Sequence, residues 1–194
     1  MGRPNLAEMR TAEILDAFER CVAIYGLEGS SLERVAEEAN MKRSILRHYV
    51  GNREDLIQAL TERVVAKYKA SLDQYLEATA EEAPVKQLLG FLFPNTPASS
   101  TESVMVVESL IAAGEKYPEV SMMMTEYIED LVNKSANLLK QEFPGASRQQ
   151  CWSVAYGIIC ICFNQESLTS LHLSAKYTKA AKSCAEVLID SLRE

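Results

Sequence analysis

The sequence predicts an all-α protein with a helix-turn-helix close to its N-terminus. Three observations lead to this fold class. Apolar residues recur at helical spacing in every long segment, no segment alternates as a strand does, and residues 31 to 56 contain two short amphipathic stretches around a tight turn. Proline and glycine fall between the periodic stretches, where helices are expected to end.

The first helix is expected to stop at Gly26. Its apolar face carries Ile14, Phe18, Val22 and Tyr25. Glycine tolerates the left-handed backbone that terminates many helices, so Gly26 is a natural C-terminal cap.

The next helix opens the helix-turn-helix. Its apolar side chains share one face at the spacing i, i+3, i+4 and i+7: Leu32, Val35, Ala36 and Ala39. Ser30 and Glu33 have the spacing of a capping box, which predicts where this helix begins. Asn40 follows where the chain must turn, and asparagine tolerates the left-handed conformation better than most residues.

The second helix of the pair is basic. It is expected to bury Leu46 and Val50 and to leave its polar residues outside: Lys42, Arg43, Ser44, Arg47 and His48. Four cations and no carboxylate lie from Asn40 to Arg53. Such a face can be mere solvation, but two short helices with a tight turn are the unit that places its second helix in the DNA major groove.

The charge is unevenly spread along the chain. Residues 1–69 hold 11 basic and 11 acidic residues, whereas residues 70–194 hold 9 and 16, so the formal charge of −7 belongs to the second part. A protein that coats nucleic acid without specificity is basic throughout. Any DNA contact is therefore expected on one small surface.

Helices are also predicted for the rest of the chain. Asn52 caps a long helix that reaches about Ala80, and prolines separate five further stretches: 84–93, 101–116, 119–142, 147–170 and 174–192. The 194 residues suit one or two small domains.

Nothing in the sequence indicates catalysis, a metal or a cofactor. The chain has two histidines and lacks zinc, nucleophile-elbow and phosphate-loop motifs, so an all-helical enzyme is disfavoured. Five cysteines without an export signal argue against a disulfide framework, and Cys160 and Cys162 are expected to be small core residues. With no apolar run long enough to span a bilayer, we expect a cytoplasmic protein.

Residues 9 to 60 resemble the DNA-binding domain of TetR-family transcriptional regulators. The first helix with its terminal glycine, the helix-turn-helix and the following GNREDL occur in the family's order and spacing. Beyond residue 60 the match is only in helical content and length. Asn40 replaces the usual turn glycine, Arg47 a typical tyrosine and Val50 a common phenylalanine, and none of these changes removes the predicted DNA function.

The resemblance implies a homodimeric repressor that binds double-stranded DNA at a palindromic operator and is released by an unknown small-molecule effector. Residues 1–51 would form the helix-turn-helix domain and residues 52–194 a helical domain for ligand binding and dimerisation, with the last two helices forming the dimer interface. A helical ligand-binding protein of this kind that has lost specific DNA binding is the alternative.

The resemblance also implies DNA contacts. Lys42, Arg43, Ser44 and Ile45 would approach base edges, and Arg47, Tyr49 and Arg53 the backbone. The remaining candidates are Ser31, His48 and Arg3, the last in a short N-terminal arm.

Candidate ligand contacts are soft or aromatic residues of the second part, together with one carboxylate: Tyr68, Phe91, Met105, Glu108, Met123, Trp152, Tyr156 and Phe163. For any one of them, ordinary core packing is the more common role. Burial of Glu108 or Glu166 beside aromatic rings would favour a cationic ligand, and an apolar ligand is expected otherwise.

Overall fold

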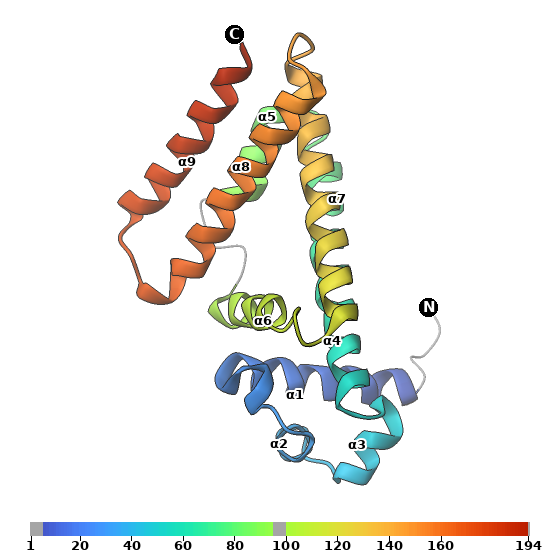
Figure 1. Cartoon of the computed structure of the whole chain (residues 1–194). Coiled ribbons are helices and arrows are strands. Elements are labelled where there is room, and N and C mark those ends of the chain that lie inside the picture. The colour runs from blue at the N-terminus through green and yellow to red at the C-terminus, as the bar shows by residue number, and fades with distance from the viewer. Residues whose placement is uncertain (1–5, 95–99, 194) are drawn as a thin grey trace. The chain divides into compact units, whose positions relative to one another are not determined.

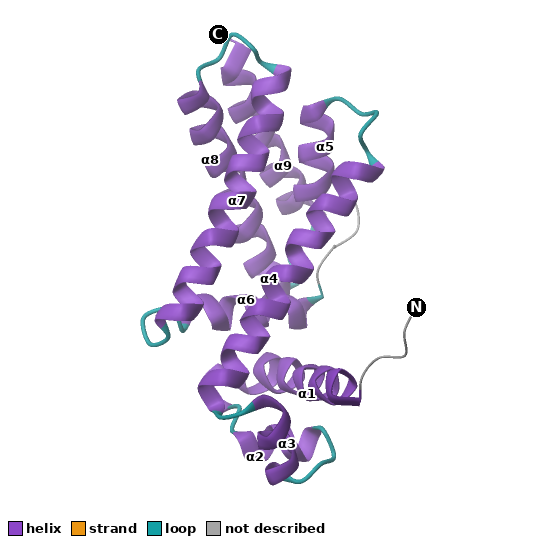
Figure 2. Cartoon of the chain, turned by 90° about the vertical axis from the view of Figure 1, so that its right-hand side faces the viewer, coloured by secondary structure: helices purple, strands orange, loops and turns teal. Residues whose placement is uncertain are grey.

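The computed structural model describes residues 6–94 and 100–193, and these residues form helices and no strands (Figures 1 and 2). The helices are α1 (Leu6–Gly29), α2 (Leu32–Glu38), α3 (Arg43–Val50), α4 (Arg53–Ala78), α5 (Pro84–Leu92), α6 (Thr101–Ala112), α7 (Pro118–Glu142), α8 (Arg148–Ser167) and α9 (Ala175–Asp190), with short 3₁₀ turns after α8 and α9. The predicted all-α fold class is confirmed.

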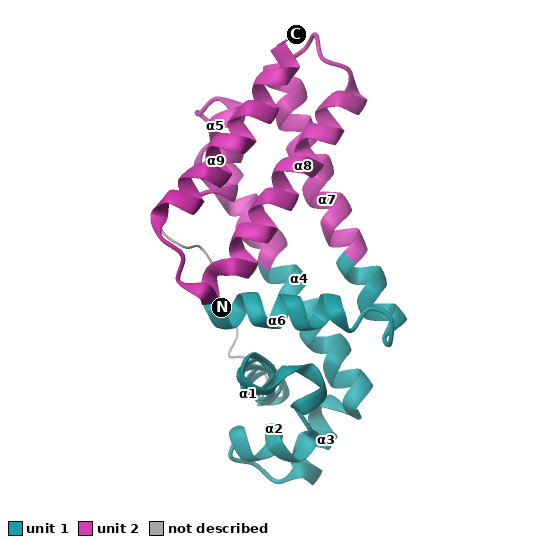
Figure 3. Ribbon diagram, turned by 60° about the vertical axis from the view of Figure 1, so that its left-hand side comes forward, with its two compact units in different colours: residues 1–67, 99–124 teal, residues 68–98, 125–194 magenta. Residues whose placement is uncertain are grey.

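The chain divides into two compact units (Figure 3). Unit 1 comprises residues 1–67 and 99–124, and unit 2 comprises residues 68–98 and 125–194. Helices α4 and α7 each contribute residues to both units. Packing therefore divides the chain within α4, whereas the expected functional boundary at residues 51 and 52 remains a prediction.

The regular helical backbone of α1 is interrupted at Gly26, as predicted. Gly26 has φ 69° and ψ 170°, and the chain then resumes a short helical stretch to Gly29. Ile14, Phe18 and Val22 are buried as expected. Tyr25 was expected on the same buried face, but it lies next to the bend at Gly26 and is 51% exposed. Its ring packs against the Arg34 guanidinium, which lies 4.1 Å from the ring centroid.

Ser31, and not Ser30, caps helix α2. The Ser31 hydroxyl accepts a hydrogen bond from the Arg34 amide at 3.3 Å. Ser30 is buried, and its hydroxyl donates to the Gly26 carbonyl at 2.7 Å, so it secures the bend in α1. The capping box predicted from Ser30 and Glu33 is therefore wrong. Asn40 has φ 50°, and its expected left-handed turn is confirmed.

The predicted cap of α4 is confirmed, with a reciprocal partner. The Asn52 side-chain oxygen accepts from the Asp55 amide at 3.0 Å, and the Asp55 carboxylate accepts from the Asn52 amide at 2.8 Å. These two bonds satisfy donors that would otherwise be unpaired at the start of the helix.

Unit 2 has its own apolar core, built from α5, α8, α9 and the parts of α4 and α7 in this unit. Leu139, Ile158 and Ile189 are among its fully buried side chains. Some helices end earlier than expected. Helix α6 stops at Ala112 rather than near 116, and residues 113–116 form turns instead. Tyr117 then precedes Pro118, a position that disfavours helical backbone.

Candidate nucleic-acid interface

Helix α3 presents a buried side and an exposed side. Leu46 is fully buried and Val50 nearly so, because they are one helical turn apart and face the packed interior. The exposed residues are Lys42, Arg43, Ser44, Ile45, Arg47 and His48, and Tyr49 is half-buried. Every predicted base-edge residue is therefore accessible to solvent, and we call these exposed residues the α3 surface.

Ile45 is the apolar member of this surface. Its side chain is 44% exposed on an otherwise polar face. A branched aliphatic group placed there has no core to fill, but it can contact the methyl group of thymine in a major groove.

Ion pairing divides the cations of this surface. The Arg43 guanidinium lies 2.5 Å from the Glu33 carboxylate of α2. Within the described part of the chain, Lys42 and Arg47 have no ion-pair partner. They are therefore free to meet phosphate, whereas Arg43 already has an anionic neighbour that sequence reasoning did not identify.

Arg53 points inward. Its Nη2 donates to the Leu27 carbonyl at 2.8 Å and lies 3.5 Å from the Glu28 carboxylate. The side chain is 25% exposed. This arrangement ties the start of α4 to the end of α1, so the guanidinium would have to leave Leu27 before it could contact a DNA phosphate. The structure thus gives Arg53 a structural role, and its contact with a DNA phosphate stays a prediction.

Glu28 extends this tie to a third segment. Lys116, in the turn between α6 and α7, donates to the Glu28 carboxylate at 2.9 Å. That hydrogen bond holds the pKa of Glu28 below its usual value, and the pKa of Lys116 is raised by the same bond. Unit 1 thus has a charged cluster where its first helix meets α4.

The remaining DNA candidates differ in their surroundings. The Ser31 hydroxyl is already engaged as the cap of α2. The His48 and Tyr49 rings make an edge contact with centroids 5.2 Å apart. Arg3 lies outside the described residues, so the predicted N-terminal arm stays a prediction.

The ligand candidates of unit 2 occupy different places. Tyr68 of α4 lies beside Tyr127 of α7, with ring centroids 6.1 Å apart, and Phe91 lies 5.4 Å from Tyr75. Phe163 packs partly buried against the core. Tyr127 was not among the predicted ligand contacts, although it lies four residues after the candidate Met123 on α7.

Trp152 and Tyr156 are not enclosed. Their rings stack on one face of α8 with centroids 5.6 Å apart, and they are 39% and 47% exposed. The other three candidates belong to unit 1: Met105 is exposed, and Glu108 and Met123 are half-buried. The eight candidates are therefore not gathered into one site within either unit.

Glu166 is the titratable residue that stands out in unit 2. It lies four residues after Cys162, whose buried thiol donates to the Leu92 carbonyl at 3.1 Å, so both side chains share one face of α8. Burial raises the pKa of Glu166. Tyr127 also has a raised pKa, chiefly through burial, with smaller contributions from Tyr68 and Glu166.

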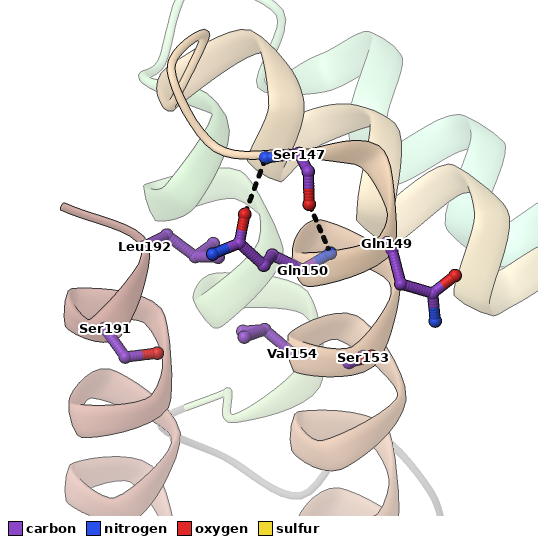
Figure 4. Close-up of a pocket in the computed structure, with 7 residues that line it drawn as sticks. All are labelled: Ser147, Gln149, Gln150, Ser153, Val154, Ser191 and Leu192. Atoms are coloured by element: carbon purple, nitrogen blue, oxygen red, sulfur yellow. Dashed lines mark hydrogen bonds between the residues drawn. The ribbon is translucent and has the colours of Figure 1, made fainter. Parts of the chain in front are cut away.

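A shallow pocket lies between the start of α8 and the end of α9 (Figure 4). Its polar lining is largely engaged in capping: the Ser147 hydroxyl accepts from the Gln150 amide, and the Gln150 side chain accepts from the Ser147 amide. None of the predicted ligand residues lines it.

Two further observations concern the described residues alone. No helix among them is long and apolar enough to cross a membrane. They contain no cluster of three or more histidine, cysteine or acidic side chains that could hold a metal ion.

Curated relatives match about half of the chain. The HTH-type transcriptional regulator BetI of Burkholderia thailandensis is 30% identical over 95 residues, which cover 49% of this chain and 48% of that protein. BetI of Burkholderia ambifaria is 28% identical over 102 residues, 52% of this chain and 53% of that protein. The chain thus aligns with about half the length of these relatives. No family model matches it.

Solved structures match nearly the whole chain. A TetR transcription regulator from Haloarcula marismortui has a TM-score of 0.78 at 16% identity, covering 94% of this chain and 97% of its own. A TetR-family transcriptional regulator from Mesorhizobium loti has a TM-score of 0.74 at 15% identity, covering 97% and 98%. The multidrug binding protein EbrR, solved with imidazole, has a TM-score of 0.65 at 18% identity, covering 96% of each chain.

These similarities define the class of protein. The chain has the all-helical fold of TetR-type regulators, with an N-terminal helix-turn-helix. The resemblance to these regulators is confirmed, since named regulators match this chain in sequence over about half of its length and in fold over nearly all of it.

Proposed function

We propose that this protein is a sequence-specific DNA-binding transcriptional regulator. The observation that carries the proposal is the solvent exposure of Lys42, Arg43, Arg47 and Ile45 at α3, while Leu46 is buried. Arginine and lysine can donate to guanine acceptors, and an aliphatic group can contact thymine. The similarity of about half of the chain to an HTH-type transcriptional regulator supports the same function.

We propose that the chain acts as a homodimer. Two copies of α3 would enter successive major grooves about 34 to 36 Å apart, so the operator should be a palindrome or nearly one. The stacked Trp152 and Tyr156 on α8 and the 68% exposed Val187 on α9 support an interface through these helices. Apolar side chains left in water on two neighbouring helices favour a self-complementary contact.

This exposure bears on the ligand candidates. Trp152 and Tyr156 suit a dimer contact better than an enclosed ligand. Tyr68, Phe91 and Phe163 are partly shielded in unit 2, so they remain candidate ligand contacts there, and Met105, Glu108 and Met123 remain candidates in unit 1.

We favour a cationic effector. Glu166 is half-buried near Tyr127, and its pKa is raised because burial disfavours the carboxylate. It also lies in the last turn of α8, where the helix dipole is negative and no basic residue is present. An organic cation would compensate both effects and could contact the aromatic rings.

The effector would act through its preference between conformations. A ligand can shift DNA affinity only by as much as it binds one conformation better than the other. Helix α4 begins directly after α3, the proposed DNA-recognition helix, and carries residues of both units. We therefore expect α4 to be the element that moves when the effector binds. Release of a repressor by the ligand is the expected outcome.

The test of the DNA function is fluorescence anisotropy on duplexes selected from genomic DNA. We expect at least about a thousandfold tighter binding to selected than to scrambled duplexes. Arg148→Met removes one exposed cation from unit 2 and should leave the preference for selected duplex intact. It is the control for substitutions that remove one cation from α3. Equal affinity for both duplexes in moderate salt would exclude a specific regulator and favour a protein of this fold that no longer reads DNA.

A further inference from the structure

The first turn of α2 places a carboxylate beside α3, the proposed DNA-recognition helix. Glu33 is the second residue of α2, a helix whose start is fixed by the Ser31 cap. Its carboxylate is 2.5 Å from the guanidinium of Arg43, the first residue of α3. The contact therefore joins the two helices of the helix-turn-helix at the end of α3 that enters the groove first.

Other acids of this region have different partners. Glu38 pairs with Arg20 of α1 at 2.6 Å, and Asp55 belongs to the cap of α4. Glu37, one turn after Glu33 on α2, is exposed and has no ion-pair partner within the described part of the chain. Glu33 thus acts on one cation of the α3 surface, and Glu37 is its natural control.

The pair is exposed enough to stay accessible. The Arg43 and Glu33 side chains are 52% and 55% exposed. Exposed ion pairs are weak, so the carboxylate does not sequester Arg43 from DNA. It does restrict the directions in which the guanidinium points, and its charge repels other anions that approach.

We propose that Glu33 is a specificity-determining positioning residue, which directs Arg43 toward a neutral base edge and away from phosphate. A guanidinium has five donors, so Arg43 can give two hydrogen bonds to guanine O6 and N7 and keep another for Glu33. A phosphate at Arg43 would instead lie close to the Glu33 carboxylate and be repelled. Discrimination arises because a guanine edge carries no net charge. This role rests on the proposed DNA-binding function.

The test is a double-mutant cycle of Glu33→Gln and Arg43→Ala, read by anisotropy against selected and scrambled duplexes over a range of salt concentrations. Glutamine keeps the size of the side chain and removes its charge. We expect Glu33→Gln to strengthen binding to scrambled duplex by about three- to fivefold, the upper range for one exposed ion pair. Affinity for the selected duplex should change by less than about twofold, and the salt slope on scrambled duplex should steepen by about one phosphate contact.

Glu37→Gln measures the general effect of removing one negative charge from α2, and it should alter both affinities by the same factor. In the Arg43→Ala background, Glu33→Gln should behave like Glu37→Gln. Thermal melting of each variant excludes a folding defect as the cause. The proposal is overturned if Glu33→Gln and Glu37→Gln have equal effects. It is also overturned if Glu33→Gln reduces the preference for selected over scrambled duplex in the Arg43→Ala background as well.

Failure of the DNA-binding function and failure of the Glu33 role give different results. If the wild-type protein binds selected and scrambled duplexes equally, the regulator function itself is wrong, and the role of Glu33 falls with it. If the wild-type protein discriminates but the cycle shows no coupling, only the role of Glu33 is wrong.

Discussion

Arg53 and Arg47 carry the same charge, but the structure gives them opposite surroundings, so one pair of substitutions separates stability from DNA contact. Arg53 donates to the Leu27 carbonyl at 2.8 Å and is 25% exposed, whereas Arg47 is exposed with no ion-pair partner among the described residues. Methionine keeps much of the aliphatic length of each side chain. Arg53→Met should therefore destabilise the protein, and Arg47→Met should weaken its binding to DNA.

The magnitude for Arg53→Met follows from its contacts. A hydrogen bond from a charged group contributes about 1.5 to 3 kcal/mol. The pair with Glu28 adds little, because that carboxylate is 63% exposed. The loss is partly offset, since Arg53 Nη1 is buried without a partner among the described residues and the cation stands at the start of α4, where the dipole disfavours it. The Leu27 carbonyl also keeps its bond from the Ser30 amide. A net loss of about 1 to 2 kcal/mol remains.

For a chain of this size, that loss lowers the melting temperature by about 2 to 8 °C. Differential scanning calorimetry measures it, and anisotropy at several salt concentrations measures the DNA contact. Arg47→Met should leave the melting temperature within about 1 °C and reduce the salt slope by about one. The reasoning is refuted if Arg53→Met reduces the salt slope by about one without a change in melting temperature, because Arg53 would then contact phosphate.

Two further predictions concern unit 2. Val187→Glu should raise the dissociation constant of the dimer by about a hundredfold or more, because two carboxylates would be desolvated at the proposed two-fold interface. Sedimentation should then show monomers, while the exposed control Ala66→Glu on α4 stays dimeric; a wild-type monomer at micromolar concentration would contradict the interface. Burial raises the pKa of Glu166 above 4.5, so its ionisation costs stability as pH rises through that raised value. Thermal unfolding from pH 4 to 8 should show Glu166→Gln matching wild type at the acidic end and exceeding it near neutrality, and a constant difference across this range would contradict the assignment.

The residue next to Val187 on α9 shows why such tests need the structure. Leu188, adjacent to Val187, has the same apolar character, yet it packs onto the unit 2 core beside Gly157. A charge at Leu188 would therefore also destabilise the packing of unit 2, so Val187 is the informative site for the interface.

The sequence by itself determined the helices and the helix-turn-helix. Period and local chemistry depend on neighbouring residues alone, so the buried pair Leu46 and Val50, the left-handed Asn40 and the Asn52 cap could all be predicted. The same local reasoning placed Lys42 and Arg43 on the exposed face of α3.

Tertiary structure decided which partners these side chains meet. The choice of Ser31 over Ser30 as a cap depended on the bend at Gly26, which turns the Ser30 hydroxyl inward. Arg53 meets Leu27 across 26 residues of sequence, and Glu33 meets Arg43 across the turn. Such contacts depend on how helices pack, and spacing along the chain does not encode them. The roles of the cations in this interface follow from packing, while their presence follows from the sequence.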